Sequence, residues 1–133
     1  MFFEAVKFEH SFIVKTEDID RQGHVNNVRY LQWIQDVAVA HWLSRATDEQ
    51  KDQIVWVVLR HEIDYLHPAF ENEAIKVVTW VGESSGAKWE RFTEIGRDDK
   101  ILVKAKSIWV ALDSKRLRPR RVDAELKETF TKL

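Results

Sequence analysis

Apolar residues at helical spacing predict one long helix in the first third of the chain. They recur at the intervals of a single helical face, and the apolar arc is wider than a surface helix needs, which indicates burial on more than one side. We place the start at Asn26 or Asn27, because a short side-chain oxygen there can cap the first turn, and the end near Arg45. The face consists of Tyr30, Leu31, Ile34, Val37, Ala38, His41 and Trp42.

Most of the remaining chain has the pattern of strands. Alternating or continuous apolar positions predict strands over residues 8–15, 54–66, 73–84, 87–97 and 100–112. Pro68 ends the second strand, because proline cannot donate to a ladder. One face of the fourth strand carries Trp89, Arg91, Thr93 and Ile95. Three further segments are expected to be a polar loop with some helical character, a basic loop and a short helix, over residues 47–53, 113–121 and 122–133.

One helix followed by strands in hairpin-like succession predicts an α+β fold with an antiparallel sheet, not alternating βαβ units. A single helix that is buried on several sides requires a sheet that curves around it. The outer face and edges of such a small sheet stay open, so we expect dimerisation by extension of the sheet. The length of 133 residues suits one domain, over residues 1–133, with one core.

Composition narrows the classes of function. A formal net charge of -1 argues against a nucleic-acid partner, because phosphate contacts need a basic surplus. No apolar run is long enough to span a bilayer, and the start of the chain lacks a basic region followed by a long apolar run. We therefore expect a soluble, cytoplasmic protein without membrane insertion. The chain has no cysteine, and His61 and His67 have no partners at metal-ligand spacing, so neither a metal nor another cofactor is expected.

A polar turn before the helix gathers most of the reactive side chains. Within residues 16–30 it holds Glu17 and two aspartates, then a glycine, a histidine and two asparagines. Gly23 is expected to let the chain turn into the helix, because glycine reaches positive φ without strain. The unpaired N–H groups and the dipole of a helix N-terminus make this end a place where negative charge is favoured.

The turn carries a family resemblance. The pattern Asp18-x-Asp20-x-x-Gly23-His24-Val25-Asn26-Asn27-x-x-Tyr30 resembles the signature of hotdog-fold thioesterases of the 4-hydroxybenzoyl-CoA thioesterase type, and is similar to their Tol-Pal-associated branch. The block Ile63-Asp64-Tyr65-Leu66-x-Pro68-Ala69 resembles a second family motif. The resemblance implies a hotdog fold, in which a five-stranded antiparallel sheet wraps one long central helix. It also implies a homodimer or homotetramer that hydrolyses acyl-CoA to a free acid and coenzyme A.

Four residues of the turn are expected to be catalytic, and the resemblance gives the roles of two of them, Asp20 and Asn27. Asp20 aligns with the catalytic aspartate, which acts as nucleophile or general base; the plain alternative is a turn or capping residue. Asn27 stands where the family uses a main-chain N–H to polarise the thioester carbonyl. Gly23 allows close approach of the substrate to the backbone. His24 either positions water, bonds a loop carbonyl or assists proton transfer, or it is structural.

The expected substrate contacts fall into two groups. Asn26 and Tyr30 belong to the motif, where Tyr30 also packs and hydrogen-bonds. The run 115–121 carries five basic residues in seven, which suits the phosphates of coenzyme A, although a solvated loop is the plain alternative. An anionic membrane surface or RNA is disfavoured by the net charge. The arginines assigned to the phosphates are Arg116, Arg118, Arg120 and, more weakly, Arg91.

Three alternatives to acyl-CoA hydrolysis stay open. Acyl carrier protein could replace coenzyme A, with the basic loop binding its acidic surface. A non-catalytic domain that binds an acyl thioester or a protein has no need of Asp20. A hotdog dehydratase or hydratase usually has its catalytic histidine in a sequence context different from this turn, so the turn speaks against that alternative. The tryptophans are expected to fill the core or the dimer interface, or to line an acyl pocket, and include Trp33, Trp42, Trp89 and Trp109.

Overall fold

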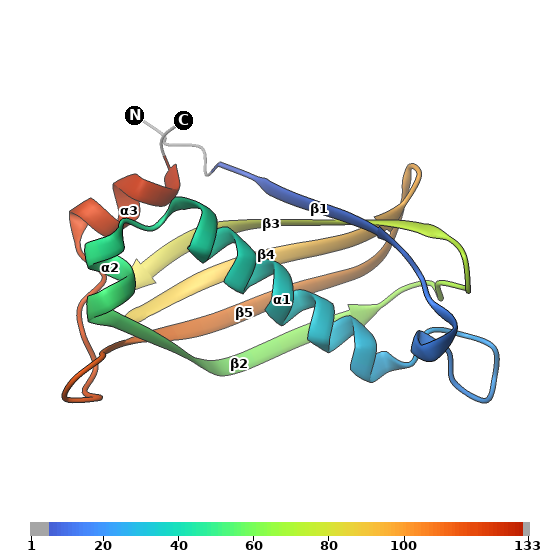
Figure 1. Cartoon of the computed structure of the whole chain (residues 1–133), viewed down its shortest axis with the longest axis horizontal. Coiled ribbons are helices and arrows are strands. Elements are labelled where there is room, and N and C mark those ends of the chain that lie inside the picture. Colours follow the sequence, from blue (N-terminus) through green and yellow to red (C-terminus); the bar gives the residue numbers. More distant parts are fainter. Residues whose placement is uncertain (1–5, 132–133) are drawn as a thin grey trace.

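The computed structural model describes residues 6–131, which form one sheet with a long helix across it (Figure 1). Met1 to Ala5 and the last two residues of the helix expected over 122–133 lie outside the described residues. Across the part that is described, no helix is both long and apolar enough to cross a membrane. The elements are β1 Phe8–Ile13, α1 Asn27–Arg45, α2 Asp48–Gln53, β2 Ile54–Tyr65, β3 Ala74–Ser85, β4 Lys88–Arg97, β5 Lys100–Asp113 and α3 Ala124–Thr131.

The five strands pair antiparallel in the order β1-β3-β4-β5-β2. β3, β4 and β5 form the expected meander, but β2 pairs with β5 and not with β3, so the expected hairpin-like succession is wrong at this connection. Residues 66–73 cross the end of the sheet instead. Pro68 ends the strand, and the Ala69 N–H then donates to the Tyr30 hydroxyl at 2.8 Å, which holds the crossing segment against α1.

α1 lies across the inner face of the sheet and buries the predicted face (Figure 1). Ile34 and Val37 pack in the main core with Ile75, Val77 and Ile95 of β3 and β4. A second core cluster lies where the end of α1 meets α3 and the far end of the sheet. The α+β class, with five antiparallel strands around one long helix, is confirmed.

The segment expected as a polar loop with helical character contains the short helix α2. Thr47 caps it, because its hydroxyl accepts from the Gln50 N–H at 3.1 Å and the Gln50 side chain accepts from the Thr47 N–H at 2.9 Å. This reciprocal arrangement is a capping box. α2 follows α1 directly and leads the chain into β2.

β2 is an edge strand with an apolar surface. Among the described strands it pairs with β5 alone. Val57, Val58 and Leu59 are 43%, 36% and 57% exposed. The ladder shifts register between Val58 and Arg60, so Leu59 has no paired residue on β5. The strand therefore presents both unpaired backbone groups and apolar side chains at its free edge.

Candidate functional site

Asp20 lies in a tight loop that precedes α1. Gly23 has a φ of 84°, a left-handed conformation that glycine adopts without strain. The turn directs the N–H groups of Gln22 and His24 back to Oδ1 of Asp20, at 2.9 and 3.3 Å. Oδ2 has no hydrogen-bond partner among residues 6–131. The carboxylate is thus held through one oxygen, while the other stays available for chemistry.

α1 begins directly after this loop. Asn26 is its N-cap, and Oδ1 of Asn26 accepts from the Val28 N–H at 3.1 Å. Asn27 is the first helical residue, and its own N–H has no hydrogen-bond partner in the described chain. N–H groups of the first turn carry the positive end of the helix dipole. A free main-chain donor therefore faces the same pocket as Asp20.

This pocket is open and has a volume of about 400 Å³. The end of β2 and the segment after it form the wall that faces the Asp20 loop. Tyr30 also lines the pocket and is buried, and burial raises the pKa of its hydroxyl, which accepts from the Ala69 N–H. That hydrogen bond joins the two sequence motifs, although Tyr30 and Ala69 are 39 residues apart in the chain.

The pocket includes residues for which the sequence indicated no role in the site. They are Tyr65, Leu66, His67 and Pro68. Three of them belong to the second sequence motif, which by itself supports only the family resemblance. His67 is exposed, so its ring is accessible from the same pocket as Asp20.

His24 and Asp18 have different surroundings. The half-buried ring of His24 lies edge-on to Phe70, with centroids 5.4 Å apart, and its nitrogens have no hydrogen-bond partner within residues 6–131. Asp18 is buried, accepts from the Lys15 N–H at 3.0 Å and pairs with Nε of Arg29 at 3.3 Å. Asp18 therefore fixes the loop, whereas His24 faces the pocket with free nitrogens.

The basic loop lies at the opposite end of the molecule from Asp20 (Figure 1). Arg116 and Arg118 are exposed, and Arg120 donates through both terminal nitrogens to Oε1 of Gln53, each at 3.2 Å. None of the three lines the Asp20 pocket. Within one copy of the chain, the basic loop and the candidate catalytic residues do not form one site.

Arg91 is not at the surface. Its side chain is on the inner face of β4, the residue is 8% exposed, and Nη1 donates to Nδ1 of His41 at 2.9 Å and to Oγ1 of Thr79 at 3.1 Å. α1 and the sheet enclose its guanidinium. The expectation that Arg91 binds surface phosphates of coenzyme A is therefore wrong.

A family model described as the thioesterase-like superfamily matches residues 14–130. The chain belongs to the thioesterase-like superfamily. The match runs from the end of β1 into α3, so it includes the Asp20 loop, α1 and all the strands that follow.

Known proteins resemble this member of the superfamily at low sequence identity. The chloroplastic acyl-[acyl-carrier-protein] hydrolase FATB3 of Cuphea viscosissima is 23% identical over 138 residues, which cover 94% of the chain and 33% of that protein. The chain thus spans about a third of the length of this curated relative.

Solved structures agree in fold. Staphylococcus aureus SAV2348, in complex with CoA, has a TM-score of 0.84 and 14% identity, covering 97% of this chain and 84% of that one. Escherichia coli YbaW, a probable thioesterase, has a TM-score of 0.80 and 21% identity, covering 93% and 98%. These likenesses confirm the expected hotdog fold.

Proposed function

We propose that this chain hydrolyses an acyl-CoA thioester to a free carboxylic acid and coenzyme A. The observation that carries the proposal is that the free oxygen of Asp20 and the free N–H of Asn27 face one open pocket. Thioester hydrolysis needs a carboxylate that attacks or activates water, and a donor for the oxyanion. Membership of the thioesterase-like superfamily supports the same chemistry.

Two routes use the same residues. As a nucleophile, Asp20 attacks the carbonyl carbon, the C–S bond breaks and the thiolate leaves; water then hydrolyses the mixed anhydride and restores the carboxylate. As a general base, Asp20 takes a proton from the attacking water and returns it to the departing thiolate. In both routes the carbonyl oxygen becomes negative beside the Asn27 N–H and the α1 dipole. Gly23 gives the substrate access to the backbone, and His24 is a second proton carrier.

We further propose that two copies associate through β2, alone as a dimer or within a tetramer. Its 12 residues span about 40 Å of free, apolar edge. When a two-fold axis is perpendicular to the sheet, a strand pairs antiparallel with its own copy. The Tyr65 end, beside Asp20, then meets the Ile54 end of the second copy.

This arrangement also accounts for the position of the basic loop. The loop follows β5 at Asp113, and Asp113 pairs with Ile54 at the start of β2. The same antiparallel pairing therefore carries the basic loop of the second copy to the Asp20 side. There Arg116, Arg118 and Arg120 of that copy are placed to bind the phosphates of coenzyme A.

The thiol carrier has two candidates. The resemblance of the Asp20 motif to the 4-hydroxybenzoyl-CoA and Tol-Pal-associated branch supports coenzyme A, as does the fold shared with a CoA complex. The name of the Cuphea relative supports acyl carrier protein as the second candidate, whose acidic surface the basic loop would bind. We propose that either reaction takes place in the cytoplasm, and that residues 1–133 form a single domain.

Release of free thiol from short-chain, long-chain and aromatic acyl-CoAs tests the proposal. Asp20→Asn preserves the shape and removes the charge, so kcat is expected to fall about a hundredfold or more in a variant that stays folded. Glu17→Gln removes an exposed carboxylate from the same segment and is expected to keep the wild-type rate. Equal rates for wild type and Asp20→Asn would rule out Asp20 as the catalyst. Thiol release from an acyl-acyl carrier protein, but from no acyl-CoA, would favour acyl carrier protein as the thiol carrier.

A further inference from the structure

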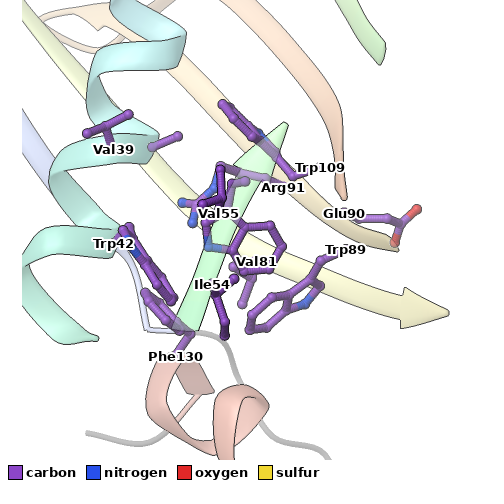
Figure 2. Close-up of a pocket in the computed structure, with 12 residues that line it drawn as sticks. Val39, Trp42, Ile54, Val55, Val81, Trp89, Glu90, Arg91, Trp109 and Phe130 are labelled. Carbon is purple, nitrogen blue, oxygen red and sulfur yellow. The ribbon is translucent and has the colours of Figure 1, made fainter. Parts of the chain in front are cut away.

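A second cavity, of about 300 Å³, lies between α1 and the sheet and does not include Asp20 (Figure 2). We call it the tryptophan pocket. Its lining comes from α1, α3 and four strands, and Figure 2 shows Trp42, Trp89, Trp109 and Phe130 around it. Small-ligand sites range from roughly 300 to 1,000 Å³. The aromatic and aliphatic walls suit a hydrocarbon chain.

Polar donors in this apolar lining lack partners. The indole nitrogens of Trp56 and Trp109 are buried, with no hydrogen bond among residues 6–131. Arg91 uses Nη1 alone, so its Nε and Nη2 groups are also unpaired in that part of the chain. In the ladder Trp89 faces Trp109 and Arg91 faces Ser107, so Arg91 and Trp109 are diagonal neighbours on the inner face. Buried donors of this kind normally have an acceptor.

Arg91 is also a buried cation without a carboxylate partner in the described chain. Burial lowers its pKa to about 10, so it stays charged at neutral pH. Its acceptors are neutral: Thr79 Oγ1, and Nδ1 of His41, whose pKa burial and the nearby arginines lower to about 3. Glu90 also lines the cavity, but its carboxylate points away from it (Figure 2) and pairs with Lys106 at 3.0 Å. A buried charge is costly unless it is paired, so the pocket favours an anionic acceptor.

The position of this pocket along α1 indicates whether an acyl chain in it could reach Asp20 of the same copy or Asp20 of a second copy. Ala38 and Trp42 line it and lie about 17 and 23 Å along the helix from Asn27, at 1.5 Å per residue. The pocket is thus remote from Asp20 of its own copy. In the proposed dimer, Val55 of the pocket lies at the end of β2 that meets the Tyr65 end of the second copy. An acyl chain held at Asp20 of one copy therefore enters the tryptophan pocket of the other.

Building on the proposed thioesterase function, we infer that the enzyme is selective for acyl groups whose far end carries a carboxylate, that is, monothioesters of dicarboxylic acids. The aromatic walls hold the methylene chain. The free N–H groups of Arg91 and the indole N–H groups of Trp56 and Trp109 bind the terminal carboxylate. That carboxylate is unchanged by the reaction, which remains hydrolysis of the thioester at the other end of the chain.

A matched pair of substrates, octanoyl-CoA and the CoA monothioester of octanedioic acid, tests the selectivity. We expect wild-type kcat/KM to favour the octanedioyl substrate by about tenfold to a hundredfold, the effect of charge-assisted hydrogen bonds. Arg91→Met keeps the length of the side chain and removes the charge, so the ratio of the two kcat/KM values should fall toward one. Lys88→Met removes an exposed cation from the other face of β4 and should leave the ratio unchanged.

Trp109→Phe provides a second variant, since Arg91→Met replaces a core residue. It keeps an aromatic ring, removes one donor and should lower the ratio by a smaller factor. Equal wild-type kcat/KM for the two substrates, or a ratio that neither variant changes, would overturn the selectivity. Hydrolysis of the thioester by Asp20 would stand in that case.

Binding of a free acid, compared with the uncharged alcohol of the same length, needs no catalysis and separates the two proposals. The tryptophans that line the pocket report its occupancy by fluorescence. Octanoate, whose carboxylate can occupy the Arg91 site, is expected to bind about tenfold tighter than uncharged 1-octanol, or more, to wild type and to Asp20→Asn, and to lose this advantage in Arg91→Met. If no acyl-CoA is hydrolysed but octanoate binds more tightly than 1-octanol, the thioesterase proposal fails and the carboxylate site stands. If 1-octanol binds as well as octanoate, the carboxylate site fails.

Discussion

At the scale of single residues, a buried contact between His41 and Arg91 links α1 to β4. Nδ1 of His41 accepts from Arg91, so the imidazole must be neutral with its proton on Nε2. Phe8 stacks on the ring and Phe130 meets it edge-on, at centroid distances of 5.2 and 4.9 Å. Protonation would place a second cation beside Arg91 in this apolar setting. The fold therefore depends on keeping His41 neutral.

This dependence predicts a loss of stability in mild acid. The pKa of His41 falls from 6.5 to about 3 in the fold, so between these values the unfolded chain binds more protons and stability decreases as pH falls. One such group contributes a slope of up to about 1.4 kcal/mol per pH unit. Denaturant unfolding at pH 7, 6 and 5 should show a shallower decline for His41→Asn, which retains an acceptor, than for wild type. Parallel declines in the two proteins would contradict the assignment.

The position of Arg91 shows what sequence alone could and could not provide. Alternation along the fourth strand placed Arg91 on one face with Trp89 and Ile95, which is the buried face in the structure. The charge of Arg91 nevertheless suggested the surface. The residues that enclose Arg91 come from other parts of the chain, since its acceptors His41 and Thr79 are 50 and 12 residues away. By contrast, the turn around Asp20 was predictable because the hydrogen bonds to the Asp20 side chain join residues within four positions.

At the scale of elements, the cap of α1 supports both the start of the helix and the proposed oxyanion donor, the Asn27 N–H. Asn26→Ala removes the side-chain acceptor of the first turn, which should cost about 1 kcal/mol of unfolding free energy. It should also lower kcat, because a frayed first turn no longer holds the Asn27 N–H in place. Asn26→Asp keeps a capping oxygen and should retain stability. Denaturant unfolding and thiol release measure the two effects.

A cap far from the site gives the matched control. Thr47→Ala removes the side-chain acceptor that caps α2 and should cost a similar free energy while kcat stays near wild type. A fall in kcat of the same size in Asn26→Ala and Thr47→Ala would mean that general destabilisation, not the position of the Asn27 N–H, is responsible.

Element types were more predictable than their partners. The 3.6-residue period identified α1, and short connections identified the β3-β4-β5 meander. The place of β2 at the edge was not predictable, because its apolar start is also the pattern of a central strand. Residues 66–73 decide its place by crossing the end of the sheet, where the contact between Tyr30 and Ala69 holds them. That contact joins residues too far apart for local patterns to reveal it.

At the scale of the whole molecule, the proposed assembly through β2 makes the site dependent on two copies. Leu59 is 57% exposed near the middle of the strand, where a two-fold axis would bring both copies of the residue close together. Leu59→Asp places like charges there and should yield monomers with little thioesterase activity. Size-exclusion chromatography with light scattering and thiol release measure both. Ile13→Asp, at 53% exposure on the other edge strand, is the control and should stay assembled and active. A fully active Leu59→Asp monomer would contradict the assembly.

Mixed dimers provide the most direct test that each site draws on both copies. In the proposed dimer, Asp20 of one copy works with the tryptophan pocket of the other. A dimer of one Asp20→Asn chain and one Arg91→Met chain would then have one site with both defects and one site with neither. Random assembly at equal amounts makes half of the dimers mixed, so about a quarter of the wild-type activity on the octanedioyl substrate should return. The variants are refolded together, and their rate is compared with the sum of their separate rates. A rate equal to that sum would mean that Asp20 and the pocket act within one copy.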